Sequence, residues 1–228
     1  MPIKGNLNES AIRYRSDILG VVGKERVIST QVGPSADLRT VNNIQNRNVL
    51  GWAFDGRLEI PIPFKLEPTL TISYAYGSGD DGAGNNNSFR QTGLEGNTSY
   101  YPENTTSGAL RNYGEVLKPE LSNIHILNTG LNLPVLKTSD LNLNYYSYWR
   151  ANSNTGIPNN GINATLSQNG NHIGQALDFV ANINIHDELN LEYPLIEKST
   201  LRIKAGSFLS GNAYGSLKNE AAYKGTLE

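Results

Sequence analysis

Residues 140–150 read DLNLNYYSYWR, and this stretch decides the fold class. One set of alternate positions is apolar or aromatic, namely Leu141, Leu143, Tyr145 and Trp149. The other set holds Asn142, Asn144, Tyr146, Tyr148 and Arg150. Because side chains alternate across a β-strand, this period of two predicts a strand with one apolar and one polar face. The stretch is also about as long as the roughly 9–11 residues with which a tilted strand crosses a bilayer.

The same alternation recurs along the chain. It is regular at 54–62, 177–185 and 201–205, and less regular at 11–15, 69–77, 121–133 and 221–228. Several of these segments approach the length of a membrane strand, so the sequence predicts about eight amphipathic strands in all. On every regular strand, charges or amides lie opposite the apolar positions, and we expect that polar face to line the inside.

Connections between the predicted strands alternate in length. Those at 63–67 and 134–139 are short and that at 187–198 is moderately longer, whereas those at 16–49, 78–119 and 151–172 are long and rich in Asn, Gly and Ser. Outer-membrane barrels pair short periplasmic turns with long extracellular loops. The fold class predicted is therefore all-β, an antiparallel up-and-down transmembrane β-barrel. We treat residues 1–228 as a single domain, in which 1–50 hold a strand and a long loop.

Composition narrows the function classes. Hydrophobic residues make up 38% of the 228 residues, 23 are Gly, and the mean hydropathy is −0.42. No apolar run reaches the roughly 20 residues of a transmembrane helix, which excludes a helical membrane protein. A net charge of −2 argues against a nucleic-acid partner, and the lack of Cys excludes disulfides and thiolate chemistry.

No motif for catalysis, a cofactor or a metal emerges. The three histidines, His125, His172 and His186, lie far apart and lack the spacing of metal ligands. Residues 79–87, GDDGAGNNN, are rich in oxygen ligands, but no Glu closes an EF-hand pattern. A flexible loop and a bound calcium ion both remain open there. We expect no enzyme activity and no cofactor.

Short segments along the chain resemble the alginate export family of outer-membrane barrels. They are FRQTGL at 89–94, YGE at 113–115, ELSN at 120–123, YWR at 148–150, GINA at 161–164, IGQ at 173–175, LD at 177–178, AG at 205–206 and NAYG at 212–215. The resemblance covers 51–228 and leaves 1–50 with little similarity. It implies an eighteen-stranded parent barrel that exports an anionic polysaccharide, of which this chain would hold the last eight or so strands.

Both ends of the sequence have the features that we expect of a partial chain. No signal peptide precedes the first strand, and the last strand does not end on an aromatic residue as barrels of this family usually do. The turn at 187–198 is shorter than the periplasmic segment that helps to occlude the pore in the family's best-known member, so plugging from that side is not expected here.

Candidate site residues are cationic, because anion pores replace the hydration of their ions with fixed Arg or Lys. Arg202 and Lys204 face the polar side of their predicted strand, and Arg90 lies in FRQTGL. The resemblance implies that these three line one constriction. Arg57, Arg111 and Arg150 are further pore-lining candidates. Ordinary solvated charges are the competing interpretation, and for Arg57 an ion-pair ladder with neighbouring acidic residues is favoured.

The expected location is the bacterial outer membrane, with outer-membrane lipid, an anionic polysaccharide such as a polyuronate and periplasmic export-complex proteins as partners. Twelve Tyr and two Trp could form interfacial girdles, although cross-strand pairing in a soluble sheet explains them equally well. The alternative is a secreted β-sandwich that binds carbohydrate. It would bury Leu141, Leu143, Leu177 and Phe179 between two sheets, and its strands would average about 5–6 residues.

Overall fold

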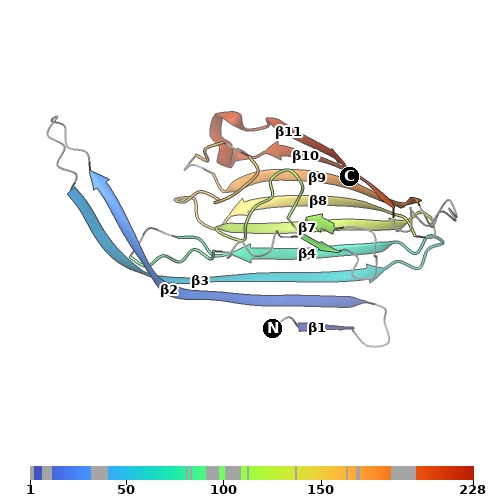
Figure 1. Cartoon of the computed structure of the whole chain (residues 1–228), viewed down its shortest axis with the longest axis horizontal. Coiled ribbons are helices and arrows are strands. Elements are labelled where there is room, and N and C mark those ends of the chain that lie inside the picture. Colours follow the sequence, from blue (N-terminus) through green and yellow to red (C-terminus); the bar gives the residue numbers. More distant parts are fainter. Residues whose placement is uncertain are drawn as a thin grey trace.

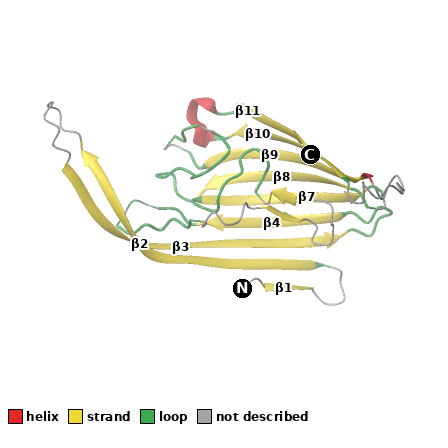
Figure 2. Ribbon diagram, viewed as in Figure 1, coloured by secondary structure: helices red, strands yellow, loops and turns green. Residues whose placement is uncertain are grey.

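The structure is a computed structural model that describes residues 3–6, 12–31, 41–80, 82, 84–90, 98–100, 109–111, 113–136, 138–162, 164–167, 170–185 and 199–228. Within these ranges, the side chains of residues 3–6, 28–31, 41–45, 98–100 and 109–111 lie outside the description. Strands dominate the fold (Figure 2).

Nine strands form one antiparallel sheet in the order β1-β2-β3-β4-β7-β8-β9-β10-β11 (Figure 1). They are β1 (Ile3–Asn6), β2 (Arg13–Gln31), β3 (Val41–Pro61), β4 (Thr69–Gly77), β7 (Ile124–Pro134), β8 (Asp140–Arg150), β9 (His172–Asn184), β10 (Thr200–Ser210) and β11 (Ala221–Leu227). A short 3-10 helix, η2 (Asn212–Leu217), joins the last two. The short strands β5 (Thr98–Tyr100) and β6 (Ala109–Arg111) pair as a separate hairpin. The all-β, up-and-down prediction is confirmed.

The sheet has two distinct ends and two open edges. We call the end with connections 78–123, 151–171 and 211–220 the long-loop end, and the end with connections 62–68, 135–139 and 185–199 the turn end. Among the described residues, β1 and β11 each pair on one side only, so this part of the chain forms an open sheet that is compatible with part of a barrel.

The two faces of the sheet differ as the alternation predicts. Leu143, Leu177 and Phe179 project from the outer face and are 44%, 48% and 38% exposed. The opposite, inner face carries the even-numbered residues of β7, β8 and β10, and those of β9 from Gly174 onward, and most of them are buried. In the described part of the chain no second sheet packs on the outer face, so a sandwich burying these side chains is contradicted.

The N-terminal region differs from the predicted long loop at 16–49. β2 and β3 run on as one antiparallel ribbon, paired from Arg13 with Glu59 to Gln31 with Val41, and its distal part bends away from the sheet (Figure 1). Alternation arises when one face of a strand is buried. The distal part of this ribbon buries neither face, as exposed Val22 on one face and exposed Val27 on the other show, and it therefore lacks that signal.

Candidate functional site

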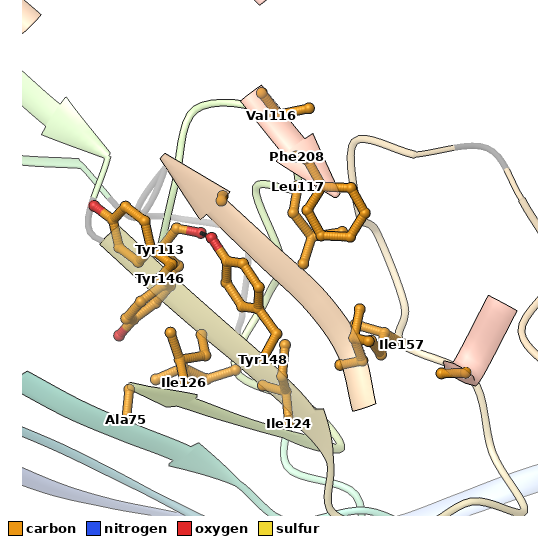
Figure 3. Close-up of a cluster of buried hydrophobic side chains, with 14 of the residues drawn as sticks. Ala75, Tyr113, Val116, Leu117, Ile124, Ile126, Tyr146, Tyr148, Ile157 and Phe208 are labelled. Atoms are coloured by element: carbon orange, nitrogen blue, oxygen red, sulfur yellow. Dashed lines mark hydrogen bonds between the residues drawn. The ribbon is translucent and has the colours of Figure 1, made fainter. Parts of the chain in front are cut away.

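A segment of the long β4–β7 connection lies against the inner face of the sheet (Figure 3). We call residues 113–117 the cross-strut. Leu117 is fully buried and Val116 is nearly so, and both belong to one apolar cluster with Ile126, Tyr148 and Phe208 from β7, β8 and β10. Hydrophobic burial therefore holds this segment against the inner face of the sheet, which alternation alone predicts to be polar and uncovered.

Hydrogen bonds extend the cross-strut toward β3. The Tyr113 hydroxyl donates to Asp55 Oδ2 at 2.8 Å, and the buried Tyr148 hydroxyl donates to the Tyr113 carbonyl at 3.1 Å. Burial, followed by the charge of Asp55, raises the pKa of Tyr113 well above its usual range. The hydroxyl therefore stays protonated and remains a donor to the carboxylate.

Charged groups tie the other end of the cross-strut to β9 and β11. The Glu115 backbone N–H donates to Asp178 Oδ2 at 2.7 Å, and Lys224 Nζ lies 3.4 Å from Glu115 Oε2. Asp178 and Glu115 are 2% and 3% exposed. Buried charges are costly unless hydrogen-bonded or paired, so these contacts are what makes the arrangement tolerable.

Two glycines make room for the cross-strut. A Cβ on Gly206 of β10 would lie 2.7 Å from Asp178 Oδ1 and 2.9 Å from Val116 Cγ2. Gly114 has a φ of +96°, and a Cβ there would collide with the Tyr148 hydroxyl. At position 114, only glycine tolerates both the left-handed backbone and the close approach.

At the turn end, two cations of β10 converge on one carboxylate. Arg202 Nη1 and Lys204 Nζ each lie 3.1 Å from a different oxygen of Glu228. These hydrogen bonds, that from Lys204 foremost, lower the pKa of Glu228. The Glu228 side chain is 44% exposed, so the carboxylate is accessible to exchange with solvent ions. The site therefore has the geometry to bind a carboxylate with two cations.

An amide network backs this pair of cations. Arg202 Nε donates to Asn182 Oδ1 at 3.0 Å, and Asn182 Nδ2 donates to Asp140 Oδ2 at 3.2 Å. Asn132 and Asn142 also donate to Asp140 Oδ2. The network crosses four strands and orients the guanidinium from behind.

Arg90 lies elsewhere. It is exposed and lines a cavity of about 330 Å³ with Ser122 and Thr155 at the long-loop end. Arg202 lies toward the turn end, eight residue steps along β10 from Ser210, or about 26 Å at the rise of a strand. The structure brings Arg202 and Lys204 together but does not bring Arg90 to them.

The remaining candidate arginines have different surroundings. Arg150 is buried and donates to the carbonyls of Ser153, Ser167 and Gly170, which makes it a clamp for the 151–171 loop rather than a cation open to a polymer. Arg57 faces inward, directly opposite Arg15 in the β2–β3 ladder. The side chain of Arg111 lies outside the described residues.

The Arg47 side chain lies in the oxygen-rich loop at 79–87, for which a bound calcium ion is one of the two interpretations. Its guanidinium donates to the Gly84 and Asn85 carbonyls and to Asp80 Oδ1, all at 2.9 Å. These are the oxygens that a calcium ion would need. Within the described ranges, no group of three or more His, Asp or Glu side chains is placed to hold a metal. The oxygen-rich loop thus encloses a guanidinium.

Aromatic side chains follow one level of the outer face near the long-loop end. Cross-strand pairing joins Phe54, Tyr76, His125, Trp149 and His172 in a row across β3 to β9. Tyr76 and His125 have ring centroids 4.8 Å apart, and Trp149 and His172 5.9 Å. Such a belt is typical of a membrane interface. Among the described residues, no helix has the length and apolar character to cross a bilayer.

Comparison with known proteins identifies the family of this chain. The sequence model of the family described as alginate export matches residues 13–225. This chain belongs to the alginate export family. The match begins within β2, so membership extends well before residue 51, where the recognisable similarity was expected to start.

Three relatives in the alginate export family are each named alginate production protein AlgE. That of Pseudomonas aeruginosa is 33% identical over 148 residues, which are 63% of this chain and 30% of the relative. Those of Pseudomonas syringae pv. tomato and Azotobacter vinelandii are 26% and 24% identical, over 80% and 78% of this chain and 38% of each relative. The chain spans about a third of the length of these curated relatives.

The segments that carry the alginate export resemblance build the docking of the cross-strut. Gly114, Glu115, Tyr148, Asp178 and Gly206 all lie in them, and all contact one another or the cross-strut. Sequence reasoning quoted these residues but gave them no role, and it missed Glu228 and Lys224. A buried acid on a strand's polar face, such as Asp178, is indistinguishable in sequence from a solvated one.

Proposed function

We propose that this member of the alginate export family forms part of an outer-membrane β-barrel that conducts an anionic polysaccharide past Arg202 and Lys204. The observation that carries the proposal is the grip of both cations on the single carboxylate of Glu228. A uronate presents the same chemical group, and a polymer carboxylate could replace that of Glu228. Arginine and lysine together supply the fixed positive charge that an anion pore needs.

The proposed location in the outer membrane is supported by the side chains on the outer face of the sheet. Its exposed Leu143, Leu177 and Phe179, with the aromatic row above them, suit contact with outer-membrane lipid. The alginate export family has a transport role rather than a catalytic one. Arg90 belongs to the proposal as a second cationic position on the path, at the long-loop end, and periplasmic export-complex proteins are the partners we expect at the turn end.

The test removes both charges in the full-length protein that carries this sequence. R202Q/K204Q should reduce anion selectivity, measured as the reversal potential of planar-bilayer recordings under a salt gradient, and should slow polyuronate export. Folding should persist, because lumen positions tolerate substitution. The wild-type preference should also weaken at high salt, where mobile ions screen fixed charges.

A matched control removes two charges from exposed lysines outside the strands. K65Q/K218Q changes net charge by the same amount, and neither lysine forms an ion pair within the described residues. Its reversal potential should equal that of the wild type. An R202Q/K204Q channel that keeps the wild-type reversal potential would remove the polyanion path and leave only the barrel.

A further inference from the structure

We propose that Asp178 is the positioning residue that holds the cross-strut, residues 113–117, as a fixed partition of the pore, so that this segment sets the bore and does not swing as a gate. The inference rests on the proposed function, because a bore has meaning only in a channel. It assigns a role to a buried acid that lies opposite Gly206, two residues along β10 from Lys204.

The cross-strut contacts strands that are far apart in the sheet. It reaches Asp55 on β3, Tyr148 on β8, Asp178 on β9 and Lys224 on β11. A flap hinged at one side would contact one edge of its opening. A segment anchored across this many strands spans the inner face and leaves the polymer only the space beside it.

Asp178 serves the cross-strut rather than the sheet. Its Oδ2 accepts the Glu115 N–H, whereas its Oδ1 is buried and, among the described residues, has no hydrogen-bond partner. This oxygen lies where a Cβ on Gly206 would come within 2.7 Å of it. An apolar residue would suit this buried position better if docking were not required, because an incompletely bonded buried carboxylate is unfavourable.

Packing argues against a swinging motion. Leu117 and Val116 belong to the same buried apolar cluster as Ile126, Tyr148 and Phe208, and undocking would open this cluster and expose the Asp178 carboxylate. Glu115 faces Lys224, so the partition does not present an isolated negative charge to a polyanion. A passing polymer thus meets a rigid, locally neutralised wall.

The first experiment measures undocking directly and needs no transport. In the full-length protein, a single cysteine from V116C is labelled with a thiol reagent, alone or with D178L or D178N. Labelling of a buried thiol tracks the open population. D178L removes the acceptor and should speed labelling by about ten- to a hundred-fold, the equivalent of losing one charge-assisted hydrogen bond. D178N keeps an acceptor oxygen and should change the rate far less.

The control cysteine is A213C, in η2, where Ala213 is buried as Val116 is. Its labelling rate should not change with D178L. If D178L speeds V116C and A213C equally, Asp178 supports the whole fold and the assignment as a positioning residue is overturned. Equal V116C rates in D178L and wild type would overturn it as well.

The second experiment separates a partition from a gate. Glu115 of the cross-strut and Lys224 of β11 meet at 3.4 Å through their side chains, and the chain has no Cys of its own, so E115C/K224C can be joined by a short cross-linker that binds both thiols through disulfides. Cross-linked E115C/K224C should keep the conductance and export of the protein without the cross-link. Conductance that is lost on cross-linking and restored by reductant would show a gate. If wild-type protein has no conductance at all, the proposed function fails while the labelling result still stands.

Discussion

The inner face of the sheet has an apolar half and a polar half, which we call the dry half and the wet half after the chemistry of their side chains, since Asn132, Asn142 and Asn182 are themselves only 1% exposed. Toward the long-loop end, Ile126, Tyr148 and Phe208 are sealed under the cross-strut. Toward the turn end of these strands, Asn132, Asn142, Asn182 and Arg202 form a hydrogen-bonded wall. Alternation therefore decides which way a side chain points, and the chemistry of the residue decides whether that position packs apolar surface or joins a hydrogen-bond network.

The two halves are suited to different tasks. Apolar packing in the dry half is non-directional and holds a rigid partition in place. In the wet half, hydrogen bonds and charges can exchange one partner for another of the same chemistry, as a carboxylate on Arg202 and Lys204 would. The comparison predicts that stability concentrates in the dry half and binding in the wet half.

The largest effect should come from truncating the dry half. F208A removes a ring that is 2% exposed and lies 6.2 Å from the Tyr148 ring and 6.1 Å from the Tyr214 ring. We expect a loss of about 3–5 kcal/mol in the free energy of unfolding, measured by urea titration in lipid vesicles, because the cavity cannot collapse fully.

Its control is the next residue on the same strand. Leu209 points to the outer face and is 45% exposed, so L209A leaves no enclosed cavity and should cost about 1 kcal/mol. Equal losses for F208A and L209A would mean that the dry half is not a closed core, and the contrast between the halves would fail.

A smaller effect is expected in the wet half. N182A removes the amide that joins Asp140 to Arg202 and takes one hydrogen-bond donor from that buried carboxylate. We expect a loss of about 1–3 kcal/mol in the free energy of unfolding, by the same titration. Anion selectivity should change with it, because Arg202 loses its orienting partner.

The exposed loop residue Asn154 supplies the matched control, and N154A should change the free energy of unfolding by no more than about 0.5 kcal/mol. An N182A protein as stable as N154A would mean that water replaces the lost amide at no cost, and the amide network of the wet half would not be a buried one.

Much of this fold follows from alternation. The predicted strand at 140–150 coincides with β8, and that at 69–77 coincides with β4. Each of these strands buries its inner face and carries apolar side chains on its outer face, which produces the alternation. The proximal ends of the β2–β3 ribbon were predicted as strands at 11–15 and 54–62, whereas its distal part was predicted as a loop because neither face is covered there. A period of two arises where one face of a strand is buried, and a free-standing ribbon buries neither face.

The site was less predictable than the fold. Arg202 and Lys204 were placed on the inner face by their spacing alone, yet their shared partner, Glu228, is 26 residues away from Arg202 in sequence. Tyr146 and Tyr148 were expected on a polar face and lie in the apolar cluster, because the cross-strut folds over them. Such contacts depend on where a long connection returns, and no local pattern encodes that.

The smallest predicted effect concerns pH in the wet half. Glu228 has a lowered pKa in the folded chain, so its contact contributes stability above the unfolded pKa of about 4.3 and loses it as pH falls through the lower folded value. Because the pair is exposed, we expect only about 0.2–1 kcal/mol.

The measurement compares wild type and E228Q by urea titration from pH 7 to about pH 3. Their difference in the free energy of unfolding should stay constant down to about pH 5 and then shrink toward zero, since a protonated Glu228 resembles the amide. E220Q is the matched control, because exposed Glu220 forms no ion pair within the described residues, and it should equal wild type at neutral pH. A difference that grew on acidification would have the wrong sign for a carboxylate held by two cations. It would mean that Arg202 and Lys204 do not grip Glu228 in solution, and the wet half would lose the observation that makes it a carboxylate site.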